Sequence, residues 1–545
     1  MRHLINQMLA HKTTQKMEYD YIIVGSGFGG SVSALRLSEK GYKVLVIEKG
    51  KWFEASDFPK TNWNFRKWLW MPGLRFFGIM KLTIFKHVAV LSGTGVGGGS
   101  LVYANTLPIP KSTFFKTGSW SKLHNWEKEL APYYTQALKM LGAAKNPKLF
   151  DGDIGLQKVA QKLGLEDKFD ATNVAVYFGE ENVTKSDPYF GGMGPSRTGC
   201  NYCGACMTGC RNDSKNTLDK NYLYLAQKHG AEILAEHEVY DVRPIDAENG
   251  KNGYEIALKT STKLFTKRKK IKSTGIIFSG GVLGTVKLLL QLKNSSLPNI
   301  SEKIGQDIRT NNETLVSVSS LEKDTNFSKG VAIGSILDTD ENSHLEICRY
   351  SEGSNAWKLM HLPYVVGSNI FSRLGKVIVS LLKSPVPYFK IYFSNSWAKK
   401  TVVLLFMQTL DSTLRFKRNI FGFMSSTVSS GKKPTPFIPE SIKLIEEYSH
   451  AVNGVSTSFA LETIAGIPST AHILGGAVMA KNHSEGVIDK DNKVFGYEHM
   501  FIIDGSMISA NPGVNPSLSI TAIAERAMDQ IAPKTDLSTS KKQAL

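Results

Sequence analysis

Four cysteines lie close together in one short stretch of the sequence. The stretch GCNYCGACMTGC, residues 199–210, holds Cys200, Cys203, Cys206 and Cys210 in the spacing C-x₂-C-x₂-C-x₃-C. Cysteine thiolates at such spacings are ligands of iron–sulfur clusters, although the bacterial ferredoxin run continues with a proline and works with a second set of cysteines. Neither feature is present, since the fifth cysteine, Cys348, stands alone. The pattern therefore leaves an iron–sulfur cluster, a zinc ion and reduced thiols packed in a tight loop as open interpretations.

A glycine-rich turn near the start of the chain is the second chemical signal. Gly25, Gly27 and Gly30 have the spacing G-x-G-x-x-G between an apolar run and a stretch of helical periodicity, and a second apolar run ends at Glu48. This order is typical of a dinucleotide site, in which the glycines allow a tight turn and close approach to a pyrophosphate. Free N–H groups at the helix start would bind the phosphates. Glu48 would accept hydrogen bonds from a ribose and repel a 2′-phosphate, which disfavours NADP and leaves FAD or NAD.

Three later segments extend this pattern. The stretch 91–107 is too rich in glycine for the interior of a helix or strand, and we expect its backbone to approach a flat ligand. The stretch 275–290 repeats the order of strand, glycine turn and helix. The block 471–531 has a strand that ends at Asp504 and a helix that starts after Asn515, whose N–H groups could bind a ring carbonyl. A dinucleotide domain in such distant pieces must be discontinuous.

From about residue 332 to residue 461 the chain changes character. It is rich in aromatic residues and in short apolar runs such as 401–410, which predict an antiparallel sheet. Within it Phe371, Leu374, Ile378 and Leu381 recur at helical spacing, which indicates either a helix packed on the sheet or a lid over an apolar pocket.

These segments predict an α/β fold (α+β overall), with a discontinuous Rossmann-type FAD-binding domain and an inserted antiparallel-sheet substrate domain. The FAD-binding domain is predicted at 19–110, 195–330 and 466–535, the substrate-binding lobe at 111–194 and 331–465, an N-terminal extension at 1–18 and a tail at 536–545.

Composition and charge narrow the class of protein further. The 545 residues are 42% apolar and carry a formal charge of +18, with a dense basic run at 266–273 that we expect at the turn of a hairpin spanning 239–271. The run indicates a solvated loop or contact with an anionic membrane surface. Nucleic acid is not an expected partner, because no known nucleic-acid-binding pattern accompanies the charge. The lack of a signal peptide, a spanning segment or a disulfide framework predicts a cytoplasmic protein, either free or peripherally bound to a membrane. Met17 could equally be the start of the chain.

Together these motifs give a sequence that resembles the glucose–methanol–choline (GMC) flavoprotein oxidoreductases, and within them the cholesterol oxidases with non-covalent FAD. The resemblance runs from about residue 19 to residue 531. It rests on stretches such as DPYFGG, CMTGC and GVNPSLSITA, which begin at Asp187, Cys206 and Gly513, and it is strongest to actinobacterial proteins assigned as cholesterol oxidases.

The resemblance implies specific site residues. The family's catalytic histidine matches His472 in HILGG, its partner asparagine matches Asn515 in GVNP, and its steroid-specific glutamate matches Glu346 in LEI; Ile473 replaces the family's proline after the histidine. The residues expected to bind FAD are Gly25, Gly27, Phe28, Gly29, Gly30, Glu48, Gly98, Gly99, Ser100, Tyr103, Asn105, Val239, Asp504, Gly505, Asn515 and Pro516.

The implied activity is oxidation of the 3β-hydroxyl of a sterol, with O₂ reduced to H₂O₂. His472 would hold or take the hydroxyl proton near neutral pH, and Asn515 would orient the substrate or the flavin. Glu346, with a pKa raised by an apolar pocket, would move a proton from C4 to C6 and isomerise the Δ5 double bond to Δ4.

Two alternatives remain open at this point. The first is a dehydrogenase that passes electrons through a cysteine-bound cluster to a partner protein, since Cys200, Cys206 and Cys210 match the C-x₅-C-x₃-C of related glucose dehydrogenases. The second is a non-catalytic flavin- or lipid-binding protein at a membrane surface.

Overall fold

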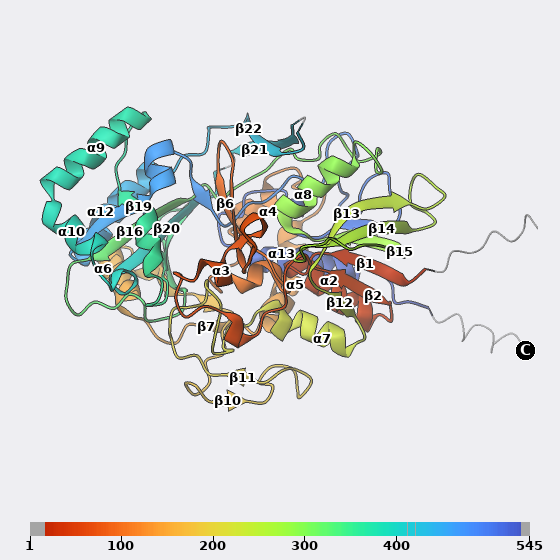
Figure 1. The fold of residues 1–545 in the computed structure, drawn as a ribbon, viewed down its shortest axis with the longest axis horizontal. Helices are drawn as coiled ribbons and strands as arrows, with labels where there is room; N and C mark the ends of the chain where they lie inside the picture. The colour runs from red at the N-terminus through yellow and green to blue at the C-terminus, as the bar shows by residue number, and fades with distance from the viewer. Residues whose placement is uncertain (1–16, 411, 420, 536–545) are drawn as a thin grey trace, which may run out of the picture.

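Two large β-sheets with helices around them make up the molecule (Figure 1). The computed structural model describes residues 17–410, 412–419 and 421–535. All but the last two residues of the predicted extension 1–18, and the whole predicted tail 536–545, lie outside the described residues. Within these ranges no helix is both long and apolar enough to cross a membrane.

The first sheet joins strands from distant parts of the chain. It consists of β1 (Tyr19–Val24), β2 (Val44–Ile47), β12 (Glu232–Leu234), β13 (His237–Pro244), β14 (Tyr254–Thr260), β15 (Arg268–Phe278) and β25 (Met500–Ile502). The order is β12-β2-β1-β15-β14-β13, and β25 also pairs with β15. β15 pairs in parallel with β1 and β25 through its second half, and antiparallel with β14 through its first half. Because strands beginning at residues 19, 268 and 500 lie together, the predicted discontinuous Rossmann-type fold is confirmed.

Helices cover this sheet on both sides. α2 (Phe28–Glu39) packs against α7 (Tyr222–Lys228) and α13 (Ser517–Asp529). Figure 1 shows α7 below the strands of the sheet and α8 (Gly281–Leu292) above them. Strands covered on both faces read as continuous apolar runs, which explains the fully buried sequence VLVI of β2.

The second sheet is antiparallel throughout. It consists of β8 (Phe169–Ala171), β16 (Thr314–Ser320), β17 (Ile333–Asp338), β18 (Ser343–Cys348), β19 (His361–Pro363), β20 (Thr401–Gln408) and β23 (Gly454–Phe459). The order is β19-β23-β16-β20-β18-β17-β8. α6 (Asp151–Leu163) and α12 (Pro439–Ala451) share a hydrophobic core with it. The predicted antiparallel sheet is confirmed, and the whole chain has a mixed α/β fold.

Two elements lie elsewhere than the predicted domain ranges suggest. β16 is a central strand of the antiparallel sheet, although it falls in the segment 195–330 that we predicted for the FAD-binding domain. α5 (Trp126–Met140) packs on α13, although it falls in the segment 111–194 that we predicted for the substrate-binding lobe. The buried Trp126 and Leu130 join α5 to the core of the first sheet.

The basic run 266–273 differs from its predicted place. It begins in the turn between β14 and β15, but Arg268 onward lies in β15 and pairs with β14. The prediction that the run lies at the turn is therefore wrong for most of it. Ile271, which is 1% exposed, holds this part of the run in the sheet while the flanking lysines reach solvent.

The predicted helix around Phe371 is present as α9 (Ile370–Lys383). The helix contacts β19 of the sheet as predicted, but not through the predicted apolar side: Phe371, Leu374 and Ile378 are 82%, 37% and 58% exposed, and Leu381 is half-buried. The helix instead packs through Arg373 and Val377, its two buried residues.

Candidate active site

The glycine turn between β1 and α2 is closed on one side and open on the other. Gly25 has a φ of +105°, and a Cβ there would lie 2.3 Å from the carbonyl oxygen of Ser279, so the position requires glycine. A Cβ at Gly27 would meet nothing nearer than the Ser279 oxygen at 4.0 Å. Gly29 and Gly30 lie in the first turn of α2 and pack closely on Ile503 and Gly25. The turn therefore leaves free backbone beside Gly27, at the N-terminus of a helix.

The second glycine cluster lies directly against the first. It contributes β6 (Ala89–Gly93) and η3 (Gly98–Leu101), so the prediction of irregular backbone is correct only between these two elements. A Cβ on Gly98 would lie 2.7 Å from the Cα of Gly27, and the N–H of Gly97 donates to Ser26 Oγ at 3.1 Å. The two clusters thus form one cradle of backbone, with the open edge that a pyrophosphate needs.

Glu48 lies at the carboxyl end of β2 and is buried. Its carboxylate accepts hydrogen bonds from the N–H and Oγ of Ser26 and from the N–H of Gly50, at 3.2, 2.8 and 2.8 Å. A carboxylate offers about four lone-pair positions, so one remains for a ribose hydroxyl. This arrangement fits a dinucleotide without a 2′-phosphate.

Three residues of the stretch 91–107 that are expected to bind FAD fall into two groups. Asn105 is fully buried, with a φ of +71°, and within the described chain its amide makes no hydrogen bond to a nitrogen or oxygen atom; it faces the thiol of Cys206, a weak hydrogen-bonding group. Tyr103 and Ser100 are already engaged: Tyr103 Oη donates to the Asn216 carbonyl at 3.0 Å, and Ser100 Oγ bonds to the Gly97 carbonyl at 2.7 Å. An unsatisfied buried amide is costly, so Asn105 points to a missing polar ligand.

The other residues predicted to bind FAD lie in η3, near the ends of strands of the first sheet, or just before α13. Asp504 accepts from the N–H of Ser506 at 2.8 Å and from Thr285 Oγ1 at 2.5 Å, and burial raises its pKa. The Phe28 and Tyr103 rings are in contact, with centroids 5.4 Å apart. Gly99 lies in η3, Val239 in β13 beside a bulge, Gly505 at the start of η8 (Gly505–Met507), and Asn515 and Pro516 just before α13.

His472 and Glu313 form a hydrogen-bonded pair that sequence reasoning did not predict. His472 follows β24 (Ser469–Thr470), and Glu313 directly precedes β16. His472 Nδ1 lies 3.0 Å from Glu313 Oε1, and Thr470 Oγ1 donates to the same oxygen at 2.6 Å. Burial would lower the pKa of His472, but the charge of Glu313 and its hydrogen bond outweigh burial and raise it. With Nδ1–H directed at Glu313, Nε2 of a neutral His472 is left as a proton acceptor.

Glu346 and Asn515 lie next to this pair. Glu346 lies in β18 and is fully buried, so it is not an ordinary exposed carboxylate of a strand. Asn515 Nδ2 donates to Glu346 Oε2 at 3.3 Å, while its buried Oδ1 is without a partner among the described residues. The charge of Glu346 also contributes to raising the pKa of His472, after the larger effect of Glu313. The structure therefore brings all three predicted catalytic residues into one cluster and adds Glu313 to it.

Another buried acid, Glu462, holds the strand that precedes His472. Glu462 lies in the short helix η7 (Leu461–Ala465), and its Oε1 accepts from the N–H of Ser469 at 2.9 Å. Burial raises the pKa of Glu462 to about 8, so the group carries little negative charge at neutral pH. It fixes the strand that leads to His472 without adding a second full charge next to Glu313.

Two family models match the sequence over most of its length. The N-terminal GMC oxidoreductase model matches residues 19–311, and the C-terminal GMC oxidoreductase model matches residues 442–524. The chain belongs to the GMC oxidoreductase family. Members of this family are flavoproteins, and the open edge at Gly27, the buried Glu48 and the poorly satisfied Asn105 fit FAD as the occupant of the cradle.

Individual relatives of this GMC oxidoreductase agree with the predicted resemblance, which is confirmed. A cholesterol oxidase of Acinetobacter baumannii is 42% identical over 535 residues, which cover 96% of each chain. A cholesterol oxidase of Mycobacterium tuberculosis is 40% identical over 94% of this chain and 91% of its own. A long-chain-alcohol oxidase of Arabidopsis thaliana is 24% identical over 95% of this chain and 68% of its own. The crystal structure of pyridoxine 4-oxidase from Mesorbium loti shares the fold, with a TM-score of 0.62 at 13% identity and coverage of 95% and 100%.

The cysteine stretch of this GMC oxidoreductase does not fit a metal centre. Across the described ranges no group of three or more His, Cys, Asp or Glu side chains is placed to hold a metal ion, and the five cysteines are free. Burial raises the pKa of Cys200 and Cys203, and that of Cys206 to about 11, so these thiols are protonated at neutral pH when no metal is bound.

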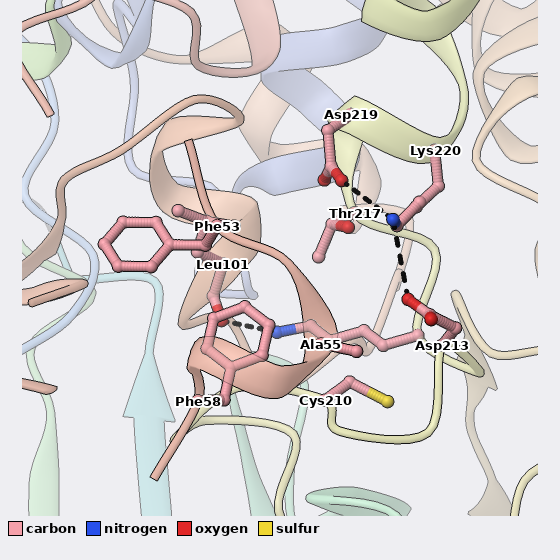
Figure 2. Close-up of a pocket in the computed structure, with 10 residues that line it drawn as sticks. Phe53, Ala55, Phe58, Leu101, Cys210, Asp213, Thr217, Asp219 and Lys220 are labelled. Carbon is pink, nitrogen blue, oxygen red and sulfur yellow. Dashed lines mark hydrogen bonds and ion pairs between the residues drawn. The ribbon is translucent and has the colours of Figure 1, made fainter. Parts of the chain in front are cut away.

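A buried lysine organises the loop that carries these cysteines. Lys215 Nζ donates to the carbonyl oxygens of Leu101 and Cys206, at 3.1 and 2.7 Å, and burial lowers its pKa to about 7. Figure 2 shows the small pocket that Cys210 lines, with the ion pairs of Lys220 to Asp213 and Asp219 beside it. The loop is thus attached to η3, one wall of the FAD cradle.

A substitution at Gly27 tests the cradle. We expect Gly27→Ala to weaken FAD binding by ~10-fold or more, because the added methyl group fills the open edge that the pyrophosphate needs. FAD affinity is measured by titrating the apoprotein and following flavin fluorescence. Gly284→Ala in α8 is the matched control, since its Cβ would also meet no atom within 4 Å; FAD affinity should not change, and stability should rise by up to ~1 kcal/mol. Equal affinity in both variants would contradict this placement of FAD.

The His472–Glu313 pair makes a signed prediction about pH. The pKa of His472 is raised mainly by the negative charge of Glu313, and only neutral His472 can accept a proton. In Glu313→Gln the charge is lost and the pKa falls, so the acid limb of the kcat/KM profile should move to lower pH. Steady-state kinetics across the pH range measure this limb. A limb that stays in place, or moves to higher pH, would show that Glu313 does not control the group that titrates.

Proposed function

We propose that this GMC oxidoreductase oxidises the 3β-hydroxyl of a cholesterol-like sterol to the 3-ketone, with FAD as the hydride acceptor and O₂ as the final acceptor. The observation that carries the proposal is the buried cluster of His472, Glu313, Glu346 and Asn515, which joins a proton acceptor to a separate carboxylate. Similarity to two cholesterol oxidases over nearly the whole chain supports the choice of a sterol.

His472 would take the hydroxyl proton. Its Nδ1 is fixed by Glu313, so Nε2 accepts the proton as the C3–H bond breaks, and the imidazolium that forms is stabilised by the Glu313 carboxylate. FAD, when bound, accepts the hydride from C3 at N5. The electron pair of the O–H bond becomes the second bond of the carbonyl group, so protons and electrons balance. Asn515 would use its unpaired Oδ1 to orient either the substrate or the flavin.

Glu346 would carry the second reaction. The proton on C4 of a Δ5-3-ketone is acidic because it lies between the ketone and the double bond. Glu346 would remove this proton and return it to C6, which moves the double bond into conjugation with the ketone. Asn515 Nδ2 holds the carboxylate by its Oε2, and His344 Nε2 lies 3.5 Å from its Oε1. The two chemical steps would therefore use different residues within one cluster.

The proposal is tested by the products of aerobic turnover. The holoenzyme is incubated with cholesterol, with a long-chain alcohol and with no alcohol, and the ketone and H₂O₂ are quantified. We expect one H₂O₂ for each 3-ketone formed, in protein free of iron. Ketone without H₂O₂ would overturn O₂ as the acceptor and favour a dehydrogenase. Turnover of the long-chain alcohol alone would overturn the sterol, and absence of turnover with every alcohol would favour a non-catalytic flavin-binding protein.

A further inference from the structure

The exposed face of α9 is apolar. Phe371, Leu374, Ile378 and Leu382 follow one another at intervals of three and four residues and so lie along one side of the helix. This side faces solvent: Phe371 and Leu382 are 82% and 75% exposed. A helix on the surface of a soluble protein normally buries its apolar side. In α9 the usual arrangement is inverted.

Buried polar contacts attach α9 to the protein by its opposite side. Arg373 is buried, and its guanidinium group donates to the carbonyl oxygens of Thr463, Ile464 and Gly367 at 2.8, 2.8 and 2.9 Å. Val377, one turn later, is buried beside it. These contacts fix the orientation of the helix, so the outward direction of the apolar side chains is built into the fold.

The next helix extends the apolar face. α10 (Pro385–Tyr392) contacts α9 and buries Tyr388 and Ile391. Val386, Phe389 and Phe393 are again spaced by three and four residues, and they are 59%, 61% and 71% exposed. The Phe389 and Phe393 rings stack with centroids 4.5 Å apart. We call the seven exposed side chains the α9–α10 surface: Phe371, Leu374, Ile378, Leu382, Val386, Phe389 and Phe393.

The chain segment that carries the α9–α10 surface has charge of one sign. From residue 353 to residue 410 the sequence has no Asp or Glu and seven Lys or Arg residues. Lys376, Lys383 and Lys390 lie exposed in α9 and α10. Lysines beside an apolar face can extend toward anionic headgroups while their stems lie along the apolar region. An exposed apolar face with an all-cationic border has the composition of a helix that lies in a membrane interface.

We propose that the α9–α10 surface docks on an anionic lipid bilayer, with its apolar side chains between the acyl chains and Lys376, Lys383 and Lys390 at the headgroups. Exposed apolar patches with a polar border mark sites of contact. The absence of Asp and Glu between residues 353 and 410 favours anionic lipid over a protein surface of mixed charge.

The docking surface is connected to the catalytic cluster by a short path. Arg373 of α9 binds the carbonyl groups of η7, which also carries Glu462, and Glu462 binds the strand that leads to His472. Lipid contact at α9 would therefore place the cluster of His472, Glu313, Glu346 and Asn515 near the membrane. This link to the substrate rests on the proposed function, because a sterol is itself a membrane component, whereas docking does not depend on it.

A second apolar and basic site offers an internal comparison. Leu264 and Phe265, at the turn between β14 and β15, are 72% and 84% exposed and lie beside the basic run 266–273. This turn is held beside the end of β2, where Ser261 Oγ donates to the Lys49 carbonyl oxygen at 2.5 Å. Substitutions at each site measure the contribution of that site to lipid binding separately.

The test uses the FAD-loaded full chain and vesicles of phosphatidylcholine with phosphatidylserine that contain no sterol. We expect the wild type to sediment with the vesicles at low salt and less at high salt. Phe371→Ser/Leu382→Ser/Phe389→Ser should lower vesicle affinity by ~10-fold or more. The matched control Leu264→Ser/Phe265→Ser should bind like the wild type.

Each alternative result has a defined meaning. Wild-type affinity in the triple variant, or lost affinity in the control, overturns the proposal, the latter in favour of the basic run. A wild type that ignores vesicles but forms dimers that the triple variant does not form overturns it in favour of self-association. Turnover of detergent-dispersed sterol is measured in parallel, and the triple variant should match the wild type. If no protein oxidises sterol but vesicle binding follows the expected pattern, the proposed function fails and the docking surface stands.

Discussion

Replacement of His472 by alanine is expected to lower kcat for sterol oxidation by ~10²- to 10⁴-fold, the usual contribution of a positioned proton acceptor. Without the imidazole, no group at this position accepts the hydroxyl proton. Glu313 also loses the hydrogen bond that it makes with His472 Nδ1. The rate of flavin reduction in a stopped-flow instrument measures the step directly, because it does not include reoxidation by O₂.

The control for this variant is another histidine. His124 is exposed, and its Nε2 lies 3.9 Å from Glu129 Oε2, too far for a hydrogen bond. Because His124 is no part of the catalytic cluster, His124→Ala should leave kcat unchanged. FAD content and the midpoint of thermal unfolding identify an effect on folding in either variant. If His472→Ala retains more than about a tenth of the wild-type rate with normal FAD content, His472 is not the proton acceptor.

Glu346→Gln is expected to separate the two proposed reactions. The amide keeps the shape of the side chain and can still accept the hydrogen bond from Asn515, but it cannot carry a proton from C4 to C6. We expect isomerisation to fall by ~10²- to 10⁴-fold while oxidation falls by less than ~10-fold. The product of the variant would then be mainly the unconjugated Δ5-3-ketone.

The two rates are measured in one assay. Formation of H₂O₂ reports oxidation, and the ultraviolet absorbance of the conjugated enone reports isomerisation. Glu313→Gln is the paired control, because it should alter the pH dependence of oxidation without selective loss of the conjugated product. Conjugated product formed by Glu346→Gln at the wild-type rate would remove Glu346 from the isomerisation.

The dinucleotide-binding fold could be predicted because its signals are local. Gly25 and Gly27 mark a turn between a strand and a helix, and both neighbouring strands form where the apolar runs predict them. β16 shows the opposite case. Its sequence TLVSVSS indicates a strand, but nothing within it determines which sheet the strand joins. That choice depends on pairing with β20 and β23, some 80 and 140 residues further along the chain.

The candidate site could be predicted only where a motif marks it. His472 and Asn515 lie in stretches that the resemblance identifies, whereas Glu313 is 159 residues from His472 in the sequence and belongs to no motif. A buried acid next to a histidine is visible only after folding. The sequence signal that could have indicated Glu313 is its place directly before an apolar strand. A charge buried at such a position is costly unless another group pairs with it.

The orientation of α9 could not be predicted for a related reason. A spacing of three and four residues shows that a helix has an apolar side, but it does not show which way that side faces. Arg373 decides the direction through its bonds to Thr463 and Ile464, which lie about 90 residues away. A cation on the polar side of a helix is ordinarily solvated, so the sequence gives no sign that this one is buried.

If the His472 cluster and FAD together oxidise a sterol alcohol, the substrate must reduce the bound flavin in the absence of O₂. The holoenzyme is mixed without O₂ with a 3β-hydroxysterol, with its 3-keto product or with a long-chain alcohol, and the flavin absorbance is followed. We expect rapid loss of the oxidised flavin band with the hydroxysterol, none with the ketone, and a much slower loss in His472→Ala. A flavin that stays oxidised with the hydroxysterol, or that is reduced equally fast in His472→Ala, would contradict this mechanism.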